Sequence, residues 1–135
     1  MWGVGSLRLL RLANPLVRSV LDSRAHRLLS GRLVLLAYRG RSSGREFLIP
    51  LRYAEMEPGA IVAIAVGAGR KQWWRAFRTA QPATLTLRGV RAEAVGVLTE
   101  GEGRAAALRA YLDRYPRSAR VTGDAAVVVF DARDG

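Results

Sequence analysis

The stretch Gly40-Arg41-Ser42-Ser43-Gly44-Arg45-Glu46-Phe47-Leu48-Ile49-Pro50-Leu51 decides how this chain folds. Its first six residues combine glycine with small polar and basic side chains, which is typical of a turn. Apolar runs at 33–39 and 46–54 flank it, so the sequence predicts two strands joined by this turn. Pro50 cannot donate to a strand ladder and therefore marks the second strand as an edge or a bulge.

Further elements follow on both sides of this hairpin. Apolar or alternating runs predict strands at 60–66, 84–87, 91–98 and 125–130. Helices are predicted at 5–30, at 70–79 and from a Thr99/Glu102 capping box to Tyr115. Because strands and helices do not alternate as β-α-β, the predicted fold is mainly β (α+β), a six-stranded antiparallel barrel with an N-terminal helix and two further helices.

Composition limits the classes of partner. The chain has 135 residues, enough for one domain, and a net charge of +11 that rests on arginine and the single lysine Lys71. Such a charge favours nucleic acid, anionic lipid or an anionic cofactor. The arginines are spread along the chain rather than clustered, so no specific nucleic acid is expected.

Cysteine is absent, and His26 is the only histidine. A chain without cysteine suits a reducing cytoplasm, and this pair of facts argues against a zinc site. The basic N-terminal helix has an apolar face, so it could either lie on an anionic membrane surface or pack over one end of the barrel. The expected localisation is cytoplasmic, with membrane association as the alternative.

Two basic segments are the candidates for binding chemistry. In the turn, Arg41 and Arg45 can form charge-assisted bonds to phosphate or carboxylate, and the hydroxyls of Ser42 and Ser43 can add to them. The alternative is a solvated hairpin tip. In the second segment, Arg70 and Lys71 open a helix whose dipole also favours an anion.

Two adjacent tryptophans follow in that second segment. Neighbouring helical positions point about 100° apart, so one ring should pack into the core while the other flanks a ligand ring or a dimer interface.

In this order and spacing, Gly-Arg-x-Ser-Gly, the Pro50-Leu51 strand and Trp73-Trp74-Arg75 resemble the deazaflavin-dependent nitroreductase family. The resemblance covers about 32–97 and implies a split β-barrel related to the pyridoxamine-phosphate-oxidase-like flavoproteins. Together with the elements predicted above, the expected organisation is an N-terminal helical extension (1–31), a barrel domain (32–132) and a tail (133–135). The resemblance further implies a homodimer that uses coenzyme F420, with FMN as the alternative, to pass a hydride to a quinone, enone or nitro compound.

The resemblance also implies which residues form the site. Because hydride transfer can require a proton, Ser43 and Tyr115 are the candidate catalytic residues, each as a proton donor, with Tyr53 and Tyr111 as alternatives. The cofactor-binding candidates are Arg41, Ser42, Ser43, Arg45, Pro50, Val66, Gly67, Arg70, Lys71, Trp73 and Trp74, with Trp73 on the cofactor side. Relatives commonly carry other residues at Ser42, Val66-Gly67 and Ala76. These departures favour a second reading, a non-catalytic binder of a deazaflavin, a flavin or a lipid-like ligand. A third reading is a basic nucleic-acid or membrane-surface protein.

Overall fold

The structure, a computed structural model, describes residues 32–57, 59–67, 73–87 and 90–132. The predicted N-terminal helical extension at 1–31, the cofactor-binding candidates Arg70 and Lys71, and the tail at 133–135 lie outside the described residues.

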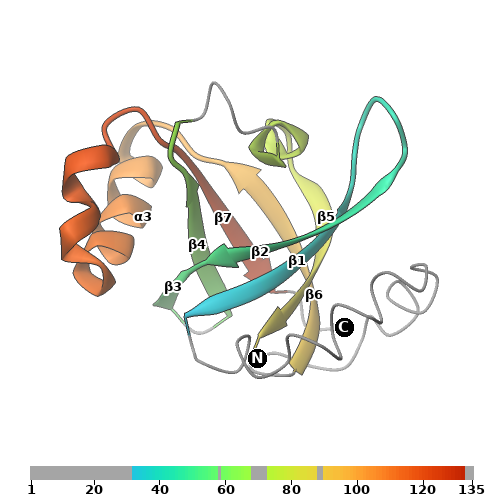
Figure 1. Cartoon of the computed structure of the whole chain (residues 1–135), viewed down its shortest axis with the longest axis horizontal. Helices are drawn as coiled ribbons and strands as arrows, with labels where there is room; N and C mark the ends of the chain where they lie inside the picture. Colours follow the sequence, from blue (N-terminus) through green and yellow to red (C-terminus); the bar gives the residue numbers. More distant parts are fainter. Residues whose placement is uncertain (1–31, 58, 68–72, 88–89, 133–135) are drawn as a thin grey trace.

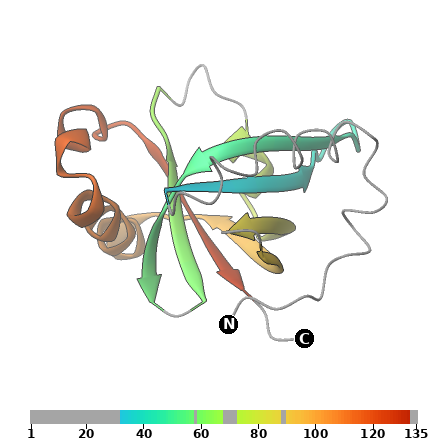
Figure 2. The ribbon, with the colours of Figure 1, turned by 60° about the horizontal axis from the view of Figure 1, so that its bottom comes forward.

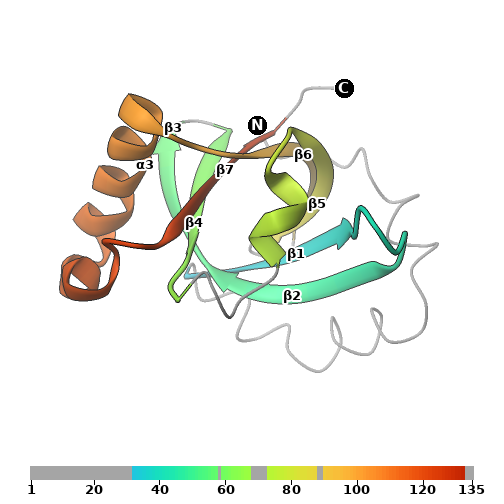
Figure 3. The ribbon, with the colours of Figure 1, turned by 90° about the horizontal axis from the view of Figure 1, so that it is seen from above.

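Seven antiparallel strands form one sheet that curls into a half-barrel (Figure 1). They are β1 (Leu33–Arg39), β2 (Glu46–Arg52), β3 (Ala54–Glu57), β4 (Ala60–Ala65), β5 (Gln81–Leu87), β6 (Val90–Leu98) and β7 (Ala126–Ala132). Their order in the sheet is β2-β1-β5-β6-β7-β4-β3, so β2 and β3 form its two edges. Pro50 lies in β2, and its expected place on an edge strand is confirmed. Seen from above, the strands wrap around a common interior (Figure 3).

The predicted number of six strands is wrong, because the run at 46–54 forms parts of two strands. β2 pairs with β1, whereas β3 pairs with β4 at the opposite edge. The change of partner takes place at Tyr53, which is 1% exposed and donates its backbone N–H to the Arg32 carbonyl at 3.1 Å. One apolar run therefore turns a corner of the barrel without any glycine to mark it.

The predicted helices are also corrected. In the described part of the chain there is one α-helix, α3 (Gly101–Arg114), with two 3₁₀ turns, η1 (Trp73–Phe77) and η2 (Pro116–Val121). Within the described part of the predicted helix at 70–79, the chain forms the 3₁₀ turn η1 instead of an α-helix. The capping box is wrong as well: the Thr99 hydroxyl donates to the Val127 carbonyl at 2.8 Å, and the N-cap residue Glu100 makes no side-chain cap bond.

The inside of the barrel and the outer face under α3 form two separate cores. Inward-facing residues of all strands except β3 surround η1 in the first core, among them Leu36, Ile61, Leu85 and Val128. α3 packs on the outside, where Ala107 and Tyr111 meet Ala54, Val62 and Val127 of β3, β4 and β7 (Figure 2).

An aromatic cluster holds η1 inside the barrel. Phe77 meets Phe130 of β7 edge to face at 5.1 Å between ring centroids, and Trp73 lies 6.4 Å from Phe130. Gly96 of β6 lies beneath them. A Cβ built at Gly96 would come within 2.6 Å of the Phe130 ring and 2.7 Å of the Phe77 ring, so only glycine allows this packing.

We predict that Gly96→Ala destabilises the protein by about 1–3 kcal/mol, because the added methyl forces both phenylalanine rings to move. Urea unfolding followed by tryptophan fluorescence measures the effect. Gly103→Ala in α3 is the matched control: its Cβ meets nothing within 4 Å, and alanine in a helix should stabilise by up to about 1 kcal/mol. Equal stability of the two variants would contradict the role assigned to Gly96.

Candidate functional site

The turn between β1 and β2 is closed by its own hydrogen bonds. The Gly40 N–H donates to the Arg45 carbonyl at 2.8 Å, and the Gly44 N–H donates to the Gly40 carbonyl at 3.0 Å. Gly44 has a φ of +69°, a value that favours glycine. The Ser43 Oγ accepts the Arg45 N–H at 3.2 Å. These three amides therefore donate within the turn itself.

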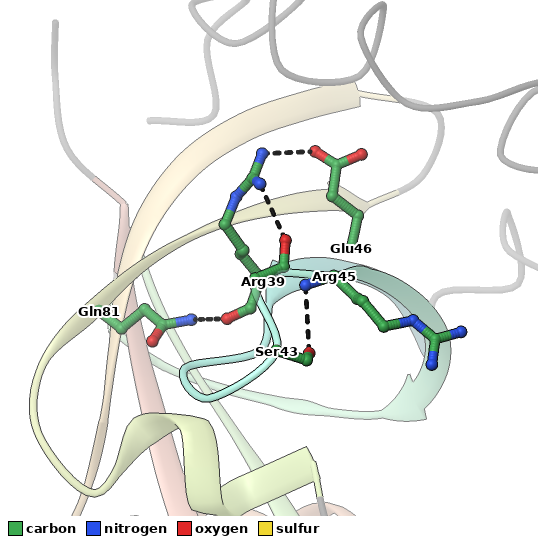
Figure 4. A network of polar contacts seen from close by, with 6 residues as sticks. Arg39, Ser43, Arg45, Glu46 and Gln81 are labelled. Carbon is green, nitrogen blue, oxygen red and sulfur yellow. Dashed lines mark hydrogen bonds and ion pairs between the residues drawn. The ribbon is translucent and has the colours of Figure 1, made fainter.

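Arg39 braces the turn from one side (Figure 4). Its guanidinium donates to the Gly44 carbonyl at 2.9 Å and pairs with the Glu46 carboxylate at 3.2 Å. Gln81, at the start of β5, donates its side-chain amide to the Arg39 carbonyl at 2.7 Å. The base of the turn is thus joined to the strand that follows η1.

Arg41 joins the turn to η1. Its Nε donates to the Ala76 carbonyl at 2.8 Å. Its Nη2 donates to the Thr79 carbonyl at 2.9 Å and to the Ala80 carbonyl at 3.3 Å. The two sequence segments that were predicted to cooperate therefore do lie against each other, at one end of the barrel.

Residues 41–45 of the turn are all exposed, and Arg45 pairs there with the exposed ring of Phe47. Figure 4 shows the Arg45 guanidinium pointing away from the Arg39 network. Its Cζ lies 5.9 Å from the centroid of the Phe47 ring, which is 37% exposed. Phe47 stacks on Tyr38 at 5.3 Å, and Tyr38 meets Phe77 at 5.6 Å. A row of aromatic rings thus runs from the surface to the core.

Phe47 is not among the site residues that the sequence predicts. It sits directly opposite Tyr38 in the register of β1 and β2, and a hairpin prediction with this pairing would have found it.

The two tryptophans have different surroundings. Trp73 is 7% exposed and packs in the core against Phe77 and Phe130. Trp74 is half-buried, with the Cζ of Arg75 at 5.6 Å and that of Arg78 at 5.3 Å from its ring. Trp73 thus lies within the core, and the more exposed Trp74 packs against its edge. Two guanidinium groups flank the Trp74 ring, whereas the rings of Phe77 and Phe130 lie against Trp73. The expectation that Trp73 is the ring on the cofactor side stays a prediction.

The remaining cofactor-binding candidates are more scattered. Ser42 is exposed in the turn, and Pro50 is exposed in the middle of β2. Val66 is half-buried and Gly67 is exposed just after β4, where Gly67 adopts a φ of +68°.

The structure does not bring the two catalytic candidates together. Ser43 lies in the β1–β2 turn, whereas Tyr115 follows α3 on the opposite side of the molecule (Figure 1). The Tyr115 hydroxyl donates to the Tyr53 carbonyl at 2.6 Å. Its ring lies 4.9 Å from the Arg52 Cζ and 4.8 Å from the Tyr111 ring. Burial raises the pKa of Tyr115, although Arg114 and Arg52 act against that rise.

Two further features bear on function. Among the described residues, no group of three or more histidine, cysteine or carboxylate side chains could hold a metal ion. No helix within the described ranges is long and apolar enough to cross a membrane.

No protein-family model matches this chain, and no curated protein matches it. Solved structures do. An F420-H2-dependent reductase, FDR-A, has 22% identity and a TM-score of 0.58 over 76% of this chain and 94% of its own. A structure described as a domain-swapped dimer has 20% identity and a TM-score of 0.60 over 89% and 100%. A candidate pyridoxamine 5′-phosphate oxidase from Listeria innocua has 8% identity and a TM-score of 0.58 over 84% and 94%.

At identities this low the likeness shows the fold alone. The chain has the split-barrel fold that these proteins share, and the barrel part of the resemblance seen in the sequence is confirmed.

We predict that Tyr115→Phe destabilises the protein by about 1 kcal/mol, because it removes the bond that ties the end of α3 to the Tyr53 corner. Since burial raises the pKa of folded Tyr115 above its usual value of 10.0, the unfolded chain loses this proton first. The contribution of Tyr115 is therefore complete below pH 10 and disappears as pH rises through the folded pKa. Urea unfolding between pH 7 and about pH 11 tests both points.

Tyr38→Phe is the control, because the Tyr38 hydroxyl makes no hydrogen bond to a described residue. It should lose less stability at neutral pH than Tyr115→Phe. A loss in Tyr115→Phe no larger than that in Tyr38→Phe would mean that the Tyr115 bond contributes little.

Proposed function

We propose that this protein is an oxidoreductase of the split-barrel class that binds a flavin-type cofactor where the β1–β2 turn meets η1. Coenzyme F420 is the proposed cofactor and FMN the alternative. The reaction is transfer of a hydride from reduced deazaflavin to a small electron-poor acceptor, such as a quinone, an enone or a nitro compound.

The observation that carries this proposal is the contact between the two segments. Side-chain bonds from Arg41 and Gln81 hold them together. Three accessible guanidinium groups and two ring faces lie on these joined segments. They belong to Arg45, Arg75, Arg78, Phe47 and Trp74.

Such a set fits a planar ring with an anionic tail. Guanidinium groups bind phosphate and carboxylate through paired hydrogen bonds. The Phe47 ring and the half-buried Trp74 ring offer faces for a flat ligand. The fold similarity to an F420-H2-dependent reductase supports the choice of deazaflavin, and the similarity to a candidate pyridoxamine 5′-phosphate oxidase supports FMN as the alternative.

When bound, the reduced deazaflavin supplies the hydride, so no side chain has to act as a nucleophile. The protein's own work is to bind, orient and exclude water. Arg45 binds the anionic tail, Phe47 supports the ring, and the aromatic row behind Phe47 keeps water out of the barrel. Of the two proton-donor candidates, only Ser43 belongs to this end of the molecule.

A homodimer is part of the proposal. The domain-swapped dimer among similar structures supports it, as does β2, an edge strand in which no residue is fully buried.

A second candidate function is binding of the same cofactor without turnover. It is favoured by the position of Tyr115, whose hydroxyl donates to the Tyr53 carbonyl far from the turn. Cofactor binding without acceptor reduction, in an assay of deazaflavin oxidation against a panel of quinones, enones and nitro compounds, would select this function.

The first test is fluorescence titration of the purified protein with coenzyme F420 and with FMN at physiological salt. We predict micromolar or tighter binding of F420, weakened about tenfold in Arg45→Ala through loss of a charge-assisted bond. Arg109→Ala on α3 is the matched control, since it removes the same charge from an exposed site across the molecule. Absence of binding by either cofactor, or equal weakening by both substitutions, would overturn the proposed site.

A further inference from the structure

Arg41 occupies a special position between the two segments. The last carbonyls of a helical turn have no partner within the turn and need donors from elsewhere. The Ala76 carbonyl, inside η1, receives the Arg41 Nε at 2.8 Å. The Thr79 carbonyl just beyond η1 receives Nη2 at 2.9 Å, and the next carbonyl along shares that nitrogen. Arg41 therefore closes the end of η1 from a distance of 35 positions in the chain.

Gln81 makes the reciprocal connection. Its side-chain amide reaches back from β5 to the Arg39 carbonyl at 2.7 Å, and its side chain is 9% exposed. The Arg41 bonds run from the turn to the η1–β5 connection. The Gln81 bond runs from the end of that connection back to the start of the turn. The two together add side-chain bonds between the turn and that connection to the β1–β5 pairing and the Tyr38–Phe77 contact.

These bonds determine how Arg41 can act on a ligand. Nε and Nη2 already donate to backbone carbonyls, so this edge of the guanidinium faces the protein. The groups proposed to meet the ligand stand on either side: Arg45 and Phe47 on the turn, and Trp74 with its two arginines on η1 and just after it. Arg41 sets the distance between these two groups.

We infer that Arg41 is a positioning residue that holds the two halves of the ligand site together by clamping backbone carbonyls, rather than a residue that binds the anion itself. This inference rests on the proposed function. It separates two arginines of the same turn: Arg45 acts on the ligand through its charge, and Arg41 acts through the geometry of η1.

The inference predicts different behaviour for charge-conserving and charge-removing variants. Lysine keeps the charge of Arg41 but cannot present two fixed donor nitrogens to separate carbonyls. Arg41→Lys and Arg41→Ala should therefore weaken F420 binding to a similar extent, about tenfold. Because a positioning residue contributes no direct ion pair, the salt dependence of the remaining affinity should match that of the unmodified protein. Arg45→Ala should instead reduce the salt dependence.

Hydrogen exchange of the ligand-free protein gives a readout that needs no cofactor. Exchange of the backbone amides at 76–81 should be faster in Arg41→Lys and Arg41→Ala, and unchanged in Arg45→Ala. Gln81→Ala removes the reciprocal bond and should shift exchange at 39–45 and 76–81 in the same direction. If thermal unfolding shows that the Arg41 variants do not fold, Gln81→Ala tests the same connection in their place.

The possible results separate this inference from the proposed function. If Arg41→Lys binds F420 like the unmodified protein, or if Arg41→Ala reduces the salt dependence as Arg45→Ala does, Arg41 binds the anion and the inference is wrong. If the unmodified protein binds neither F420 nor FMN, the proposed function fails. Faster exchange in the Arg41 variants would then still establish the clamp, and unchanged exchange would remove it.

Discussion

Close packing of Phe77 and Phe130 over Gly96 is the constraint on which the rest of the structure depends. The two rings meet at 5.1 Å because β6 offers a backbone without a side chain beneath them. Trp73 completes the cluster, and the cluster fastens η1 to the inner face of the sheet. Once η1 is fastened there, Trp74 and its flanking arginines lie at the same end of the barrel as the β1–β2 turn. The position of the candidate site is therefore a consequence of core packing.

Arginine has a structural use in this protein that a net charge of +11 does not reveal. Arg39 bonds the carbonyl of Gly44, and Arg41 bonds the carbonyls around the end of η1. Arg104 of α3 does the same at the approach to β7, where its Nη2 reaches the Ala125 carbonyl at 2.9 Å and two preceding carbonyls at 3.2–3.3 Å. A guanidinium group carries several donors in one plane, which suits it to backbone that no strand or helix pairs.

Because several arginines bond backbone carbonyls within the fold, the high net charge is weaker evidence for a polyanionic partner. An arginine that donates to carbonyls within the fold is placed by the backbone it serves, and not by a nucleic acid or a lipid surface. For the described residues, the hypothesis of a basic nucleic-acid or membrane-surface protein is supported by the charge alone. The cofactor reading has in addition the aromatic rings that accompany Arg45, Arg75 and Arg78.

Features that depend on local pattern could be predicted from the sequence. The first strand at 33–39 and the glycine-bounded turn agree with the structure, because each is encoded within a few residues. The division of one run into β2 and β3 could not be predicted, since the corner at Tyr53 is set by partners at opposite edges of the sheet. Thr99 stands in the sequence pattern of a helix cap, but its hydroxyl donates to the carbonyl of Val127, which lies 28 positions away.

The candidate site shows the same division. The sequence predicts that the turn and the second basic segment cooperate, and the structure joins them. Whether a given guanidinium meets a ligand or a carbonyl depends on what lies opposite in the folded chain. Arg41 and Arg45 are indistinguishable by residue type and local context. Only in the folded chain does Arg41 bond the carbonyl at the end of η1, while Arg45 lies beside the exposed Phe47 ring.

The two ends of the barrel are stabilised by different means, and this difference bears on function. At the α3 end, the Tyr115 hydroxyl and the stacked Arg52 and Tyr111 fix a corner of the backbone. At the turn end, side chains from two segments bond each other's carbonyls while ring faces and Arg45 remain accessible. At the α3 end the half-buried Tyr115 ring already has the guanidinium groups of Arg52 and Arg114 against it, and its hydroxyl is bonded. At the turn end, the exposed Phe47 ring and the half-buried Trp74 ring lie beside exposed arginines. The hydroxyl of Tyr115 is bonded to the Tyr53 carbonyl at the opposite end, so of the two predicted proton donors only Ser43 lies near the turn.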